Sequence, residues 1–171
     1  MATLDKETLR NTMKDLAKEH PRFRSERDFR DALCEKIQNV FLDSEIRFEC
    51  HASLKGEDIR IDIIVSLEGA LLPIELKWKL KSHQAETENR KRMIGDIERL
   101  ASLRLEHLKD LNFVKKPHTI QNRFVMWLSD NDRYWNEEGK NKILDYNGNE
   151  IIWEPYGNDG NFRFALIEAA E

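Results

Sequence analysis

Apolar and polar residues alternate along two neighbouring stretches near the middle of the chain, residues 58–66 and 71–79. The apolar positions are Ile59, Ile61, Ile63 and Val65 in the first stretch, and Ile74, Leu76 and Trp78 in the second. A period of two predicts strands with one buried face. Only a short segment that contains Gly69 separates them, so we expect an antiparallel hairpin with a loop over residues 67–70.

Apolar residues spaced three and four positions apart predict three helices. The first covers residues 3–20 and ends before Pro21. The second starts after Ser25, a typical N-cap residue that is followed three positions later by an acidic residue. The third covers residues 91–111. For residues 82–89 two interpretations stand, an exposed loop or the frayed start of the third helix.

The remaining apolar segments predict further strands. Residues 45–54 alternate and form the first strand, while residues 123–129 contain a continuous apolar run, which is typical of a strand covered on both faces. Because the second of these follows a helix, we expect it parallel to the strand at 71–79. In the tail, Asn147-Gly148 predicts a hairpin, and residues 162–167 form a last strand or short helix.

The predicted fold class is α/β in the broad sense, an α+β arrangement with a mixed sheet. Its core order is α-β-β-β-α-β, preceded by an additional N-terminal helix and followed by a C-terminal β extension. The 171 residues are expected to form a single domain, residues 1–171.

The polar face of the central hairpin brings acidic residues together. With the loop at 67–70, Ser66 opposes Leu71, and counting back places Asp62 opposite Glu75. Like charges that face each other across strands are destabilising, so this arrangement calls for a cation between them. Carboxylate oxygens suit Mg²⁺ or Mn²⁺.

Asp62, followed after an apolar run by Glu75-Leu76-Lys77, resembles the PD-(D/E)xK nuclease superfamily over about residues 25–130. The resemblance implies a restriction endonuclease-like fold and a metal-dependent nuclease. It implies Mg²⁺ or Mn²⁺ held by Asp62, Glu75 and the backbone carbonyl of Leu76, with Lys77 orienting the attacking water. The chain departs from the family pattern at Ile61, where the family has proline.

Several further residues have two interpretations each. Glu26, at the start of the second helix, either complements the helix dipole or, as in relatives of this superfamily, points at the metal as a catalytic residue. Asp96 and Arg99 either approach the substrate phosphate or are helix-surface charges paired with neighbours. Asp130 and Asp132 are extra ligands or turn residues.

Nucleic-acid contacts are expected from basic residues near the carboxylates, namely Lys79, Lys81, Arg92 and Arg99. The aromatic pair Tyr134 and Trp135 either stacks on a base or packs in the core. A second Glu-x-Lys triplet begins at Glu138, but it lies in a polar stretch without strand character, and we assign it no role.

Composition narrows the functional classes. Hydrophobic residues make up 40% and charged residues 35%, with a net charge of −4, which argues against a protein that coats nucleic acid but not against a nuclease. No apolar run approaches the roughly 20 residues that span a bilayer, and the N-terminus lacks a signal-peptide pattern. Two cysteines, Cys34 and Cys50, fit a reducing compartment, so we expect a cytoplasmic protein without membrane contact.

The sequence therefore predicts an Mg²⁺- or Mn²⁺-dependent phosphodiesterase that cleaves nucleic acid, DNA in preference to RNA. One alternative is a non-catalytic nucleic-acid-binding or protein-interaction subunit built on the same fold. Another is an unrelated small interaction protein. A homodimer, and a protein partner that supplies specificity, are left open.

Overall fold

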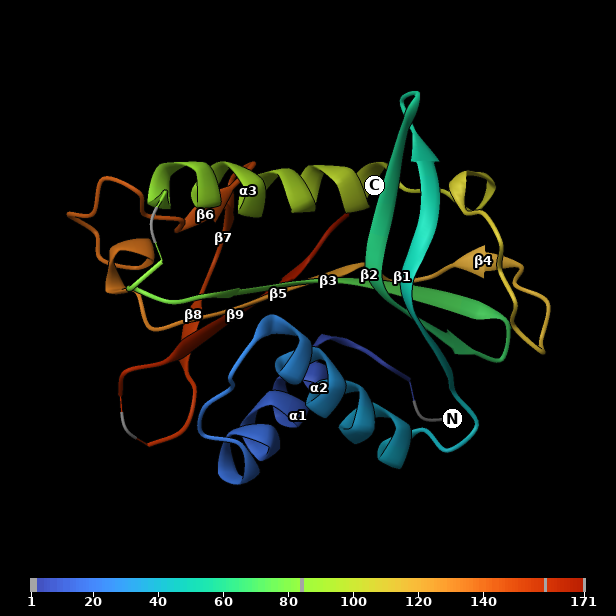
Figure 1. Cartoon of the computed structure of the whole chain (residues 1–171), viewed down its shortest axis with the longest axis horizontal. Coiled ribbons are helices and arrows are strands. Elements are labelled where there is room, and N and C mark those ends of the chain that lie inside the picture. The colour runs from blue at the N-terminus through green and yellow to red at the C-terminus, as the bar shows by residue number, and fades with distance from the viewer. Residues whose placement is uncertain (1–2, 84, 159, 171) are drawn as a thin grey trace.

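The computed structural model describes residues 3–83, 85–158 and 160–170. A mixed sheet forms the middle layer of the molecule (Figure 1), with the strand order β1-β2-β3-β5-β9-β8 and a short β4 beside β3. β3 and β5 are parallel, whereas the other neighbours along this path are antiparallel. The strands are β1 Glu45–Leu54, β2 Glu57–Leu67, β3 Ala70–Lys79, β4 Thr119–Ile120, β5 Phe124–Ser129, β8 Trp153–Pro155 and β9 Arg163–Glu168. The mixed α+β class and the parallel placement of β5 are as predicted.

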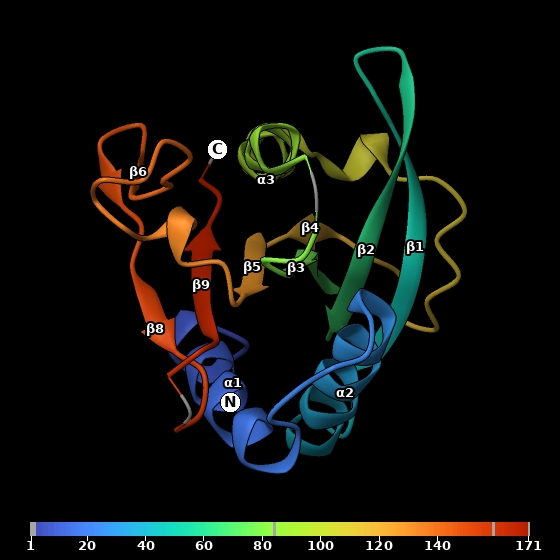
Figure 2. The same cartoon turned by 60° about the vertical axis from the view of Figure 1, so that its left-hand side comes forward.

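Helices cover both faces of the sheet. α1 (Lys6–Glu19) and α2 (Glu26–Val40) lie on one face and α3 (Glu86–Ser102) lies on the other (Figures 1 and 2). The second helix begins after Ser25 as predicted, whereas the first begins at Lys6, later than the predicted residue 3. Asp5 and Ser25 are their N-caps, and the two side chains accept backbone N–H groups at 2.8 and 3.1 Å. Short 3₁₀ turns follow α3 and β5, η1 Leu105–His107 and η2 Asp132–Tyr134.

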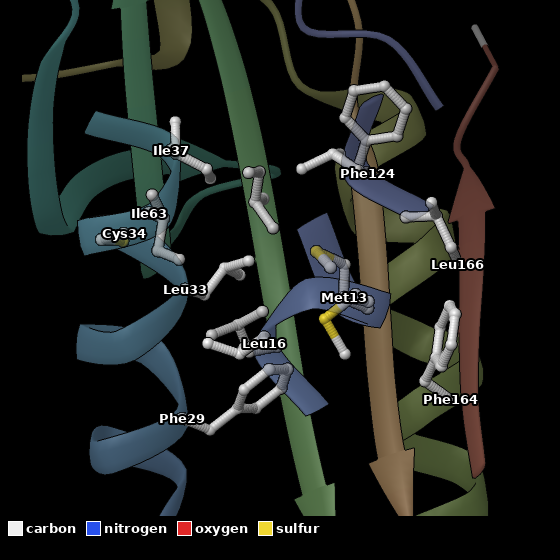
Figure 3. Close-up of a cluster of buried hydrophobic side chains, with 14 of the residues drawn as sticks. Met13, Leu16, Phe29, Leu33, Cys34, Ile37, Ile63, Phe124, Phe164 and Leu166 are labelled. Carbon is white, nitrogen blue, oxygen red and sulfur yellow. The ribbon is translucent and has the colours of Figure 1, made fainter. Parts of the chain in front are cut away.

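The larger apolar cluster lies between the sheet and the first two helices. Figure 3 shows Met13 and Leu16 of α1 beside Phe29 and Leu33 of α2, with Phe164 of β9 nearby. All of these side chains are fully or almost fully buried. Burying a large apolar side chain contributes about 1.5–3 kcal/mol, so this cluster holds α1 and α2 against the sheet.

A second apolar cluster lies under α3, where Met93, Ile97 and Leu100 contact the opposite face of the sheet. β5 contributes to both clusters, with Val125 and Trp127 on the α3 side and Phe124, Met126 and Leu128 on the other. The prediction that this continuous apolar run forms a strand buried on both faces is thus confirmed.

The third helix differs from the prediction at both ends. It begins at Glu86, after Ala85 in a left-handed conformation, so the helical interpretation of residues 82–89 holds from Glu86 onward; Gln84 lies outside the described residues. It ends at Ser102 instead of continuing to residue 111. The Arg123 guanidinium binds the Leu103 carbonyl, which turns the chain away. Leucines beyond this point keep helical spacing, but they pack outside a helix against the apolar cluster under α3, and Leu108 forms a bridge with Ala52 of β1.

The β2–β3 connection is tighter than predicted. The expected four-residue loop is a two-residue turn, in which Glu68 and Gly69 have φ values of 52° and 86° and Leu67 already pairs with Ala70. Two consecutive positive φ values are typical of a hairpin turn of type I′, which favours glycine at the second position. The predicted register, Ser66 opposite Leu71, is correct.

The regular alternation of buried residues along β2 breaks at Asp62. Ile61 packs in the cluster under α3, whereas Ile63 packs in the opposite cluster, so the prediction that residues 59–65 alternate on one face is wrong here. The β2–β3 ladder ends at Ile63 and Ile74. On the other neighbour, β1, Glu49 lies level with Asp62 and has a φ of 49°. Beyond this point the β1–β2 hairpin leaves the sheet and projects past it (Figure 1).

The tail completes one edge of the sheet. For residues 162–167 the strand interpretation is correct from Arg163 onward, where β9 begins. Asn147-Gly148 forms the predicted hairpin turn, between β6 (Asp145–Tyr146) and β7 (Asn149–Glu150).

Tyr134 stacks on Trp153 and is 1% exposed, so its role is packing. Within the described ranges, no helix has the length and apolar character to cross a membrane.

Candidate active site

The candidate site forms where β3 faces α3. Glu75 and Lys77 project from β3 toward α3, and both meet charged side chains of that helix. Arg99 Nη2 donates to Glu75 Oε1 at 2.7 Å and to Asp96 Oδ1 at 2.9 Å, while Lys77 Nζ lies 3.0 Å from Asp96 Oδ2. Glu75 is 1% exposed and Asp96 is 4% exposed. Asp96 and Arg99 do pair three positions apart, as the helix-surface interpretation predicts, but Asp96 is buried and both side chains also bind charged residues of β3.

Asp62 joins this group from the neighbouring strand. Its Oδ2 accepts the backbone N–H of Leu76 at 2.8 Å, beyond the point where the ladder between the two strands ends. The side chain thus replaces a backbone carbonyl as the hydrogen-bond partner of β3. The Asp62 carboxyl therefore lies near Glu75, close enough to raise the pKa of Glu75. The predicted ladder pair of Asp62 with Glu75 does not form, because the ladder ends before it, and Asp62 approaches β3 through its side chain instead.

The proximity of the two acids leaves a charge to be balanced. Burial raises the pKa of Glu75 well above its ordinary value, and the adjacent Asp62 carboxyl raises it further, against the lowering effect of Arg99. A buried carboxyl group beside a second acid is stabilised by a proton or by a nearby cation, and Arg99 is one such cation. The oxygen donors present, two carboxylates and the Leu76 carbonyl, are of the kind that Mg²⁺ or Mn²⁺ takes, with water filling the other positions.

Lys77 remains a cation in this setting. Burial favours its neutral amine, but the carboxylates of Asp96, Glu26 and Asp62 outweigh burial and raise its pKa. Its Nζ also lies 3.3 Å from the Leu76 carbonyl oxygen, to which it donates. Lys77 is thus suited to stabilising negative charge, not to removing a proton at neutral pH.

Glu26 reaches the site from the first turn of α2. Its Oε2 accepts the backbone N–H of Trp78 at 3.0 Å, and burial raises its pKa. The two interpretations of Glu26 are compatible, because it occupies the first helical position and its carboxylate also points toward β3.

A cavity of about 390 Å³ opens beside these residues, between α2 and the bend in β1 and β2. It is lined by Glu26, Arg27, Arg30, Phe48, Glu49, Asp62 and Leu76. The cavity places two of the candidate carboxylates, those of Glu26 and Asp62, in contact with solvent-accessible space.

The predicted nucleic-acid contacts separate into two groups. Lys79 and Arg92 lie near each other at the edge of the site; burial lowers the pKa of Lys79, and Arg92 lowers it too. Lys81 is exposed, with Nζ 3.6 Å from Asp132 Oδ1. Arg99, by contrast, is committed to Glu75 and Asp96.

The acidic residues after β5 have structural contacts. Asp130 Oδ1 accepts the backbone N–H of Lys81 at 2.6 Å, and Asn131 caps the turn that follows. Asp130 thus binds the segment that follows β3, and this contact supports neither the turn nor the ligand interpretation of Asp130.

No sequence pattern indicates the arginine–aromatic pair that lines the cavity. Arg30 and Phe48 lie 18 positions apart on different elements, and the Arg30 guanidinium carbon lies 4.1 Å from the centre of the Phe48 ring. Nothing in the spacing of these residues indicates the contact. The exposed fraction of Phe48, 43% on a strand whose apolar residues were expected to be buried, identifies it only in the structure.

Neither a family model, nor a curated protein, nor a solved structure matches this chain. Within the part of the chain that the structure describes, no group of three or more His, Cys, Asp or Glu side chains has an arrangement that could hold a metal ion. The case for metal thus rests on the proximity of two carboxyl groups and on the backbone carbonyl beside them.

Proposed function

We propose that this protein is a metal-dependent nuclease of the PD-(D/E)xK type, which hydrolyses phosphodiester bonds in nucleic acid, DNA in preference to RNA. The observation that carries the proposal is that Asp62 Oδ2 binds the backbone N–H of Leu76 at 2.8 Å, next to buried Glu75, with the Lys77 ammonium two residues further along the same strand. The element order α2-β1-β2-β3-α3-β5, with β5 parallel to β3, is compatible with a restriction endonuclease-like core.

The charges support a divalent cation. Four carboxyl groups (Glu26, Asp62, Glu75 and Asp96) face three cations (Lys77, Lys79 and Arg99) within this group. A proton can balance the remaining negative charge in the metal-free protein, as the raised pKa of Glu75 indicates. A divalent ion would supply positive charge without protonating the ligands.

Each residue then has a defined part. Asp62, Glu75 and the Leu76 carbonyl would hold Mg²⁺ or Mn²⁺, which when bound neutralises phosphate charge and activates water. Lys77 stabilises the negative charge that develops on the phosphate oxygens. Asp96 holds Lys77 in place, and Arg99 holds both Asp96 and Glu75. Glu26 binds a water or a second cation at the wall of the cavity.

The test is a cleavage assay on single-stranded DNA, duplex DNA and RNA with Mg²⁺ or Mn²⁺. We expect wild-type activity that requires metal and falls at least about a hundredfold in Asp62→Asn and Glu75→Gln. Glu138→Gln is the matched control, because it removes the acid of the exposed second Glu-x-Lys triplet. Activity that survives both site substitutions would overturn the proposal.

One observation favours a second candidate, a non-catalytic nucleic-acid-binding subunit of the same fold. Lys77 and Arg99 are both already engaged by carboxylates, so internal ion pairs satisfy much of the site. Metal-independent binding of nucleic acid without cleavage under any of these conditions would support this candidate.

A further inference from the structure

Two kinds of group line the cavity beside Asp62. One is a set of carboxylates, those of Glu26, Glu49 and Asp62, and the other is an arginine–aromatic pair, Arg30 with Phe48. Arg27, one helical turn before Arg30, adds a second cation to the lining. A volume of about 390 Å³ is within the usual range for a pocket that takes a small molecule.

Phe48 has surface left for a ligand. The Arg30 guanidinium lies over the ring at 4.1 Å and so covers one face, yet 43% of the residue remains exposed. Arg30 itself is held by Asp31 at 3.0 Å and its side chain is 15% exposed. A fixed guanidinium behind an aromatic ring gives a rigid platform, and nucleic-acid bases stack on such rings whatever their identity.

We propose that this cavity takes an unpaired nucleotide, with its base stacked on Phe48 and its phosphates directed toward Arg27 and the candidate metal ligands. The assignment of the reacting phosphate rests on the proposed function; the base platform does not. A base inside a duplex is stacked on both faces and cannot enter a cavity between a helix and a strand, so the substrate class is single-stranded or locally unpaired nucleic acid.

Binding without cleavage tests the inference separately from the nuclease activity. Fluorescence anisotropy would measure the affinity of a short labelled single strand and of its duplex, at one fixed salt concentration, in EDTA and again with Ca²⁺. We expect the single strand to bind more tightly. Phe48→Ala should weaken it about tenfold, within the range of one base–aromatic stack, while Phe48→Trp should retain it.

The chain offers a matched control for the Phe48 substitution. Phe113 also lies under an arginine, with the Arg47 guanidinium carbon 5.3 Å from its ring, but it does not line the cavity. Phe113→Ala should leave the affinity unchanged. Circular dichroism of each variant verifies that the fold is intact.

The outcomes separate the two proposals. Equal affinity for single strand and duplex, or equal effects of Phe48→Ala and Phe113→Ala, would overturn the inference even if cleavage is observed. A Phe48-dependent preference for single strands without cleavage would support the inference and count against the nuclease. Competition by a free mononucleotide as strong as that of the strand would show that the cavity takes a nucleotide and not a chain.

Discussion

The Asp62 carboxylate accepts the backbone N–H of Leu76 at 2.8 Å, where the β2–β3 ladder has already ended. A side chain thus completes the hydrogen bonding of β3 and is itself fixed beside Glu75. The distortion of β2 has a cost in regular pairing, and it creates both the approach of Asp62 to Glu75 and the cavity next to it. The site is therefore built into the irregular part of the sheet.

The raised pKa of Glu75 makes stability depend on pH. Because burial disfavours its ionised form, ionisation of Glu75 opposes folding. In metal-free protein the free energy of unfolding should fall as the pH rises from about 4.5, the ordinary pKa of the group, through its raised folded-state pKa. Glu75→Gln mimics the protonated form, and we expect it to stabilise the protein by at least about 1 kcal/mol near pH 8, with the gain vanishing toward pH 4.5.

Urea unfolding in EDTA across this pH range measures the effect. Glu138→Gln, an exposed substitution of the same kind, should change nothing. If Glu75→Gln destabilised the protein equally at every pH, ionised Glu75 would be a net stabilising partner of Arg99 and the account of its pKa would be wrong.

Asp96 is a positioning residue for Lys77 in the proposed reaction. Removing the 3.0 Å ion pair with Asp96→Asn should lower kcat about 10- to 100-fold with little change in KM. Asp96 also raises the pKa of Lys77, so the alkaline limb of the kcat profile should move to lower pH in this variant. A lower kcat with an unmoved alkaline limb would assign Asp96 a structural role only.

Lys79 and Arg92 should contact phosphate rather than bases. Burial and the neighbouring cations lower the pKa of Lys79, which an incoming phosphate would reverse. We expect Lys79→Gln and Arg92→Gln each to weaken nucleic-acid binding uniformly across sequences and to reduce the slope of log affinity against log salt by about one. The exposed Lys14 on α1, substituted in the same way, is the control. Unchanged salt slopes would remove both residues from the interface.

Much of the fold follows from local sequence signals. The capped start at Ser25, the apolar run of β5 and the register set by the Glu68-Gly69 turn were all predictable, because each depends on neighbours in the chain. The end of α3 was not, because it depends on Arg123, 20 residues further on, binding the Leu103 carbonyl. Helical spacing of leucines continues beyond that point without a helix.

The site was predictable to a similar extent. Alternation along two strands was enough to bring Asp62 and Glu75 near each other, although it missed the break in β2 at Asp62. The ion pairs that Asp96 and Arg99 make with Lys77 and Glu75 of β3 were not predicted, since charges three apart on a helix pair equally well at the surface. Arg30 and Phe48 carry no local signal, and only the packing of α2 on β1 brings them together.

The central claim is that Asp62 and Glu75 hold a divalent cation, and isothermal titration of Mn²⁺ tests it most directly. Wild type and Glu138→Gln should bind Mn²⁺ with the same affinity, with release of protons because the raised pKa of Glu75 favours its protonated form and binding displaces that proton. Asp62→Asn/Glu75→Gln should fold but bind no Mn²⁺ at this site. Binding that is unchanged in the double variant, or absent from correctly folded wild type both alone and with a single-stranded oligonucleotide present, would contradict the account.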